Sequence, residues 1–210
     1  MAASAEMMQR ANDAYARNDF DSAESLYRSV IERGGLFPED LLDCYVHLGA
    51  VRGAQSKKDP ALLAFRRAAL INLDFKLPKG ATKRAIQLAE AAKKDIARFG
   101  PVGLRLESPV SVRAGQPIRI QASIEAVHTA VIPKLTFEAK ETLSGKLHTD
   151  SKPVEGTVTF EVPAAMTLSA ATVAIVVSAI DSNGNAMATL EQRVAVEGSR
   201  AAAIAAAKAE

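Results

Sequence analysis

The first hundred residues carry apolar side chains at the spacing of amphipathic helices. The clearest stretch has small or apolar residues at steps of three and four, which places them on one face of a helix. These residues are Ala23, Leu26, Tyr27, Val30 and Ile31. Breaks at 18–19, 34–35, 59–60 and 78–80 divide residues 4–99 into about five predicted helices. Asp21 or Ser22 is expected to cap the second helix, and Thr82 the fifth.

After Pro101 the hydrophobic period changes from about 3.6 residues to two. Ile118, Ile120 and Ile124 alternate with polar neighbours, which is typical of a strand with one buried face and one wet face. Similar runs near 104–106, 134–140, 156–162, 172–180 and 186–196 predict about seven strands in a β-sandwich over residues 102–198. The predicted fold is therefore α+β with two domains. The Ala-rich tail at 199–210 is a marginal helix by propensity or the remnant of a linker.

Part of the helical half repeats an earlier part of it. Ala61, Phe65 and Ala68 each lie 38 residues after a residue of similar kind. Self-similarity at this period indicates stacked helical hairpins, and the two hairpins resemble tetratricopeptide repeats. The resemblance rests on Tyr45, Leu48, Gly49, Ala61, Phe65 and Ala68 in the second copy, and on Ala11, Phe20, Ala23 and Tyr27 in the first. It implies a solenoid whose cap is the fifth helix.

Tetratricopeptide repeats bind extended peptides along the concave face of each hairpin's first helix. By this resemblance the face comprises Met8, Asn12 and Tyr15 in the first copy, and Asp43, Val46, Ala50 and Gly53 in the second. Met8 stands where chaperone-binding members place a lysine that clamps a C-terminal carboxylate, so the sequence departs from that pattern. The alternative is that two repeats serve only as a spacer, with the face covered by a neighbouring domain.

The strand half resembles immunoglobulin-like or fibronectin-type domains, through SVRAGQPIRIQASI at 111–124 and VAIVVSAIDSNGN at 173–185. The paired cysteines and tryptophan of antibody domains are missing. Helical repeats, the stretch AFRRAALINLDFKLPKG at 64–80 and then a sandwich resemble bacterial cell-envelope proteins. That resemblance implies a periplasmic or cell-envelope location, with the cytoplasm left open. It also implies a non-enzymatic protein-binding scaffold or adaptor of an assembly, secretion or motility complex.

The alternative from another class is a surface or polysaccharide-binding protein that uses the sandwich loops. Sugar rings usually need an exposed aromatic platform, and the strand half offers only Phe137 and Phe160. The net charge is +2, with 26 Lys/Arg and 24 Asp/Glu, so no nucleic-acid partner is expected. Membrane association is expected only through segments outside this chain, because the longest apolar run, at 171–180, is too short to span a bilayer.

No constellation of residues indicates catalysis, a metal or a cofactor, and an enzyme is not expected. Cys44 and His47 share one helix face, but a closed zinc site needs four ligands and a nucleophile needs an orienting third group. We therefore interpret them as a buried thiol and a surface histidine. The stretch 181–185 resembles the start of a calcium loop. It is interpreted as a turn between strands, because Ala186 and Gln192 replace the required Gly and Glu.

Overall fold

The computed structural model describes residues 2–198, so the predicted Ala-rich tail at 199–210 lies outside the described residues. The chain forms two compact units. The first contains the helices up to Gly103 together with the segment Asp181–Met187, and the second contains Leu104–Ile180 and the chain from Ala188 onward. Helices precede strands, and the predicted α+β layout with two domains is confirmed.

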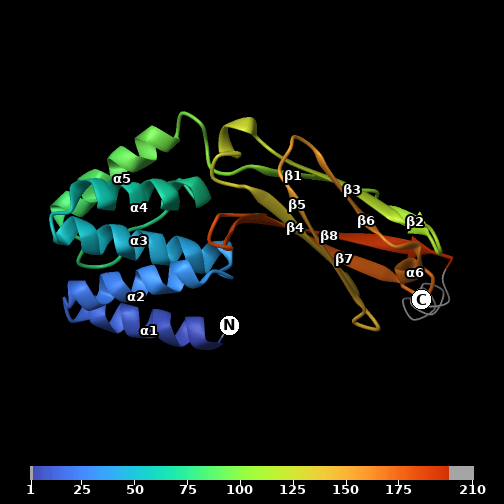
Figure 1. Cartoon of the computed structure of the whole chain (residues 1–210), viewed down its shortest axis with the longest axis horizontal. Coiled ribbons are helices and arrows are strands. Elements are labelled where there is room, and N and C mark those ends of the chain that lie inside the picture. The colour runs from blue at the N-terminus through green and yellow to red at the C-terminus, as the bar shows by residue number, and fades with distance from the viewer. Residues whose placement is uncertain (1, 199–210) are drawn as a thin grey trace, which may run out of the picture. The chain divides into compact units, whose positions relative to one another are not determined.

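The helical unit is a stack of five helices in chain order, with α3 in the middle (Figure 1). Their bounds are Ala2–Ala16 for α1, Phe20–Arg33 for α2, Pro38–Ala54 for α3, Lys58–Ile71 for α4 and Lys83–Ile96 for α5. Each helix contacts the next one along the chain, and α3 also contacts α1 and α5. This is the contact pattern of stacked helical hairpins.

Side-chain caps fix where two of these helices begin. The Thr82 hydroxyl accepts a hydrogen bond from the backbone N–H of Ala85 at 3.2 Å, which confirms the predicted cap of α5. The expected cap of α2 at Asp21 or Ser22 is wrong. Asp19 caps this helix instead, accepting from the N–H of Ser22 at 3.3 Å. The cap lies two residues before Asp21, directly after Asn18, which takes the left-handed conformation at φ 58°.

Helix α3 is buried around most of its circumference, and two glycines let its neighbours approach closely. A Cβ atom placed on Gly49 would lie 2.6 Å from the ring of Phe65 on α4, and one on Gly53 would lie 2.8 Å from the Cβ of Ala85 on α5. Phe65 itself is fully buried. The residues of α3 that are buried are Leu41, Cys44, Tyr45, Val46, Leu48, Gly49, Ala50, Val51 and Gly53. The core of the helical unit is therefore centred on α3.

The second unit consists of eight strands in two sheets. The strands are Leu104–Glu107 (β1), Ser111–Arg113 (β2), Ile118–Ile124 (β3), Lys134–Glu141 (β4), Leu147–Pro153 (β5), Val158–Val162 (β6), Thr172–Ile180 (β7) and Ala186–Glu197 (β8). One sheet has the order β1-β3-β6 and the other β2-β8-β7-β4-β5, with β2 parallel to β8. Two short helices interrupt the strands, η1 at Ala126–His128 and α6 at Ala164–Thr167.

The two sheets pack together through the buried face of each. Phe137 of β4 and Phe160 of β6 stack with their ring centres 5.0 Å apart, and both rings are buried. Inward residues alternate with exposed ones along β3 and β6, as the period of two predicts. The sequence pattern missed β2 and β5. The former has only three residues, and the latter is a polar edge strand without a hydrophobic run.

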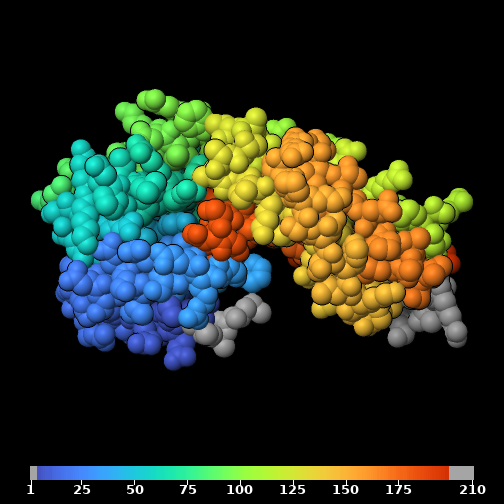
Figure 2. Space-filling model, in the orientation of Figure 1, coloured from blue at the N-terminus to red at the C-terminus, as the bar shows by residue number. Residues whose placement is uncertain are grey.

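The segment Asp181–Met187, which follows β7 and includes the first two residues of β8, belongs to the helical unit. It forms the predicted turn, and its backbone also pairs with the connection between α2 and α3. Gly35 donates to the carbonyl of Gly184 at 3.1 Å, and Ala186 donates to the carbonyl of Leu36 at 2.9 Å. In Figure 2 the orange-red atoms of this segment lie against the blue atoms of the helices. We call this segment the docked turn.

Asn185 is the central side chain of the docked turn, and it is fully buried. Its Oδ1 accepts from the N–H of Leu36 at 3.2 Å, and its Nδ2 donates to the carbonyl of Ile31 at 3.0 Å. Gly34 must remain glycine beside it, because φ is 76° and a Cβ atom would lie 2.2 Å from the Asn183 carbonyl oxygen. The end of α2 is thus fixed by a residue more than 150 positions later in the chain.

The first prediction concerns the contact between Gly49 and Phe65. Gly49→Ala should lower the free energy of unfolding of the helical unit by about 1–3 kcal/mol, although alanine favours helices, because the added methyl group overlaps a buried ring. Denaturant unfolding followed by helical circular dichroism measures the change. Gly103→Ala is the control, since no atom lies within 4 Å of its Cβ position. An equal loss of unfolding free energy in Gly49→Ala and Gly103→Ala would contradict a tight contact between α3 and α4.

The second prediction concerns the docked turn. Asn185→Ala should destabilise the helical unit by about 2–4 kcal/mol, because two buried backbone groups lose their partners. Asn183→Ala provides a matched control in the same turn, since Asn183 is exposed and its side chain makes no hydrogen bond in the described part of the chain. The midpoints of denaturant unfolding should therefore separate the two variants. Indistinguishable midpoints would show that the turn contributes nothing to the helices.

Candidate interaction surface

The structure divides the seven residues of the predicted concave face into two sets. Met8, Asn12, Tyr15 and Asp43 are partly exposed. Val46, Ala50 and Gly53 are buried, with Val46 only 4% and Ala50 only 1% exposed, so a partner cannot reach these three as the resemblance implies. At Gly53 the neighbour is α5, whose Ala85 packs against this glycine.

The accessible residues of the predicted face lie mainly along α1. Met8, Asn12 and Tyr15 are spaced i, i+4 and i+7, so they form one stripe of this helix. The stripe faces α3, which α1 contacts. The Oδ1 atom of Asn12 accepts a hydrogen bond from the Tyr27 hydroxyl at 2.5 Å, which anchors the middle of the stripe to α2. Asn12 therefore has a structural partner already, while Met8 is free to contact a ligand.

A groove of about 770 Å³ runs beside Met8, between the start of α1 and the connection from α2 to α3. We call it the α1 groove. Its apolar surface comes from Ala5, Met8, Leu36 and Phe37. The Phe37 side chain is 53% exposed, an unusual state for a large aromatic residue. Arg33 and Asp40 also line the groove and add one charge of each sign. The sequence pattern placed only Met8 in this site.

A cluster of polar and aromatic side chains joins α1, α2 and α3 beyond the groove. The His47 ring stacks on Tyr27 with the centres 5.4 Å apart, and Tyr15 meets the same ring edge-on at 5.3 Å. His47 Nδ1 lies 3.1 Å from Oδ1 of Asp43 and 3.0 Å from the Asp43 carbonyl oxygen. The interpretation of His47 as a simple surface residue missed this cluster, although its i, i+4 spacing from Asp43 was a usable signal.

Asp43 controls the protonation of His47. Burial lowers the pKa of the imidazole, but the hydrogen bond and negative charge of Asp43 outweigh that effect and raise the pKa above its ordinary value. Burial raises the pKa of the neighbouring Cys44 thiol to about 12, so the thiol stays protonated. Within the described residues, the Cys44 thiol makes no hydrogen bond to the His47 ring.

The docked turn uses the carboxylate of Asp181 internally. Its Oδ1 atom accepts from the N–H groups of Asn183 and Asn185, at 2.9 and 2.8 Å. Within residues 2–198, no group of three or more His, Cys, Asp or Glu side chains is positioned to hold a metal ion. Among the helices in the same range, none combines the length and the apolar character needed to cross a membrane.

The chain was compared with known proteins at the level of sequence. No protein-family model matches the chain, and no curated protein matches it significantly.

The third prediction concerns the pair of His47 and Asp43. A pKa raised in the folded state adds stability that is complete below the ordinary value of 6.5 and disappears as the pH rises through the raised value. Asp43→Asn should therefore reduce the free energy of unfolding below pH 6.5 and have little effect at alkaline pH. The loss should be under about 1 kcal/mol, because the Asp43 side chain is 42% exposed and water screens the pair.

Denaturant unfolding at one pH below 6.5 and at one alkaline pH measures the loss of stability. An NMR titration of His47 follows its protonation. Asp40→Asn is the control, because Asp40 lies on the same helix without pairing with a histidine in the described residues. The effect of Asp40→Asn on the free energy of unfolding should be the same below and above the pH at which His47 titrates. A cost of Asp43→Asn that is the same at both pH values would show that the charge of His47 is not coupled to Asp43.

Proposed function

We propose that the protein is a non-enzymatic scaffold or adaptor that binds an extended segment of a partner protein in the α1 groove. One observation carries the proposal. The face of α3 is covered by α5, whereas the face of α1 keeps a groove with the exposed Phe37 ring and the half-buried Met8 side chain. Exposed aromatic and methionine side chains at a concave surface are typical of protein-binding sites.

The helical unit is proposed to be a pair of tetratricopeptide-like hairpins with α5 as the cap. Two features support this proposal: the close approach of Phe65 to Gly49, and the burial of Ala23, Tyr27, Ala61 and Phe65 at corresponding positions of the repeat. Both are what the pairing of helices within and between such hairpins requires. In this reading the second repeat uses its concave face to hold the cap, and the first repeat uses its face for the partner.

The chemistry of the groove favours a particular kind of segment. An apolar side chain of the partner can cover Met8, Leu36 and Phe37, which together supply the largest apolar part of the lining. Arg33 and Asp40 carry opposite charges at the rim, so they orient a segment that has a charge of each sign rather than attract a strongly acidic or basic one. The departure at Met8 from the lysine of a carboxylate clamp agrees with this preference.

The strand unit is proposed to be an immunoglobulin-like domain, and the whole protein to serve a bacterial cell-envelope assembly, secretion or motility complex in the periplasm. The support is the resemblance in the order of helical repeats and strands. The rival proposal, a polysaccharide-binding protein, finds less support. Phe137 and Phe160 are stacked on each other in the interior of the strand unit, so neither ring is a platform for a sugar.

The fourth prediction tests the groove by site-specific photo-crosslinking in cells of the source organism. A photoreactive amino acid at Phe37 or Met8 should give a discrete adduct with another protein, because both side chains face the groove. Ser29 is the matched control position. It lies on α2, is exposed and does not line the groove. Adding Ala5→Asp to the Phe37 variant should remove the adduct, since a charge in the groove opposes an apolar ligand.

Two outcomes would contradict the proposal. One is the absence of any protein adduct at both groove positions while the protein is expressed and folded. The other is the same set of adducts from Ser29 as from Phe37, which would indicate random collisions. Circular dichroism of each variant shows whether the helices are intact, and Ala5 is suitable for substitution because it is exposed.

A further inference from the structure

A second surface of the helical unit differs from the α1 groove in both charge and shape. Residues 66–98 contain nine Lys/Arg and only three Asp/Glu, although the whole chain has a net charge of only +2. The small net charge of the whole chain therefore hides a local excess. This excess lies on α5 and on the connection that leads into it from α4.

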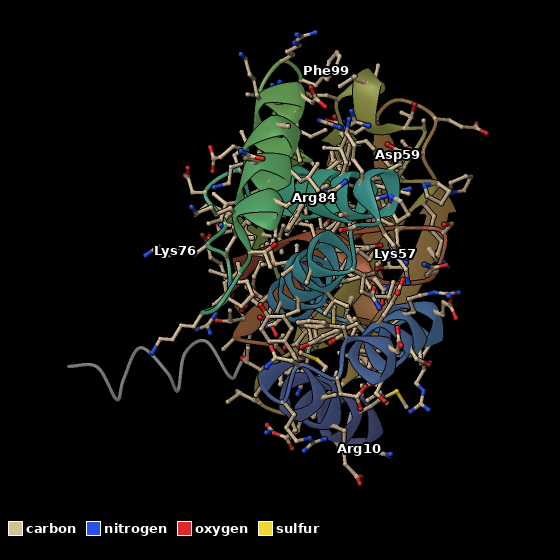
Figure 3. All side chains as sticks on the ribbon, turned by 90° about the vertical axis from the view of Figure 1, so that its left-hand side faces the viewer. Arg10, Lys57, Asp59, Lys76, Arg84 and Phe99 are labelled. Atoms are coloured by element: carbon tan, nitrogen blue, oxygen red, sulfur yellow. The ribbon has the colours of Figure 1, made fainter. Side chains whose placement is uncertain are left out.

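Six cations form this surface, and all six are exposed. They are Lys76, Lys79, Lys83, Arg84, Lys94 and Arg98. Within the described residues, none of the six makes an ion pair with an acidic side chain. We call this set the α5 basic surface. Figure 3 shows Lys76 and Arg84 on the α5 side of the helical unit, with Phe99 beyond the far end of α5.

The acidic residues of α5 cannot neutralise the surface, because other cations already hold them. Asp95 accepts a hydrogen bond from Nε of Arg66 at 2.9 Å, and Glu90 lies 3.4 Å from the ammonium group of Lys93. Lys93 also lies over the Phe75 ring, 4.6 Å from its centre. Arg66 and Lys93 thus have structural partners, whereas the six cations of the basic surface do not. Their charges remain available to an external anion.

Helix stability does not explain the placement of Lys83 and Arg84. Lys83 and Arg84 lie in the first turn of α5, which has no acidic residue. The first turn is the positive end of the helix dipole, where cations are unfavourable and acids are preferred. Lys83 and Lys94 fall on one stripe of the helix, opposite the buried Ala85, Ala89 and Ala92, and Arg98 lies in the turn just after it. A local arrangement that opposes helix stability points to a role in binding.

We propose that the α5 basic surface binds the anionic headgroups of a lipid bilayer as a peripheral contact. The proposal goes beyond the proposed scaffold function and does not depend on the α1 groove. Four of the six cations are lysines, whose flexible point charges suit mobile headgroups better than the fixed carboxylate geometry that favours arginine. Exposed Ile86 and Phe99, at 45% and 56%, add apolar side chains of the kind that enter the headgroup region. Clusters of four to eight Lys/Arg are typical of such contacts.

This inference differs from the expectation that membrane association requires segments outside this chain. A peripheral contact needs no spanning helix, because the attraction is electrostatic and acts at the headgroups. It is also compatible with the absence of a dense basic face in the overall charge count, since the excess is confined to one helix and its connection.

Co-sedimentation with lipid vesicles tests the proposal on the full chain. The protein should sediment with vesicles of phosphatidylcholine and phosphatidylglycerol at low salt, and should remain in solution with phosphatidylcholine alone. High salt should release it, because mobile ions screen exposed charges. Each lost cation should weaken binding about fivefold. The variant with Lys83, Arg84, Lys94 and Arg98 all changed to Gln should therefore bind the anionic vesicles at least about a hundredfold more weakly.

A control variant removes the same charge elsewhere on the helical unit. Arg10, Arg17, Arg28 and Lys58 are exposed and are changed to Gln, and Figure 3 places Arg10 at the opposite end of the view from Phe99. This control should keep most of its vesicle binding. The basic-surface variant should fold, because all four substituted side chains are exposed, and circular dichroism checks this.

Three results would overturn the proposal. The first is no sedimentation of the native chain with anionic vesicles at low salt. The second is an equal loss of binding in the two variants, which would make net charge rather than this surface responsible. The third is retention of the native chain on immobilised polyglutamate without binding to vesicles. That result would assign the surface to an acidic protein instead of a bilayer.

Discussion

The close approach of α4 and α5 to α3 at two glycines is the constraint on which the helical unit depends. Gly49 admits the buried ring of Phe65, and Gly53 admits the backbone of α5 at Ala85. Any larger residue at either position forces the helices apart, because packed cores tolerate little added volume. With α4 and α5 fixed in this way, most of the surface of α3 is buried, and α3 becomes the centre of the core rather than a binding helix.

This constraint determines which surfaces are left for partners. Helix α3 holds α5 at Gly53, and its Val46 and Ala50 are buried, whereas α1 keeps a groove with Met8 and Phe37 at its surface. The outer side of α5 is then exposed and carries cations without acidic partners. The cluster around His47 lies between these parts, holding α1 to α2 and α3 through Tyr15 and Tyr27. The burial of α3 thus leaves two separate surfaces on the helical unit, the apolar α1 groove and the charged outer side of α5.

The sequence predicted the order and type of most elements, because periodicity and caps such as Thr82 are local signals. It predicted the turn at 181–185 but not its docking on the helices, since Asn185 finds its partners at Ile31 and Leu36, about 150 residues earlier. The candidate site was predicted in part. The repeat pattern located Met8, but the burial of Val46 and Ala50 depends on tertiary packing, which no local pattern specifies. Phe37 was missed because an exposed aromatic residue looks like a core residue in sequence.

Hydrogen exchange of the protein, free and bound to the partner captured at the groove, tests the central claim most directly. Amides of α3 should exchange slowest in both states, because this helix is the core of the unit. Binding should slow exchange in α1 and at residues 34–40, and leave the strand unit unchanged. Protection confined to the strands, or fast exchange in α3 of the free protein, would contradict the account.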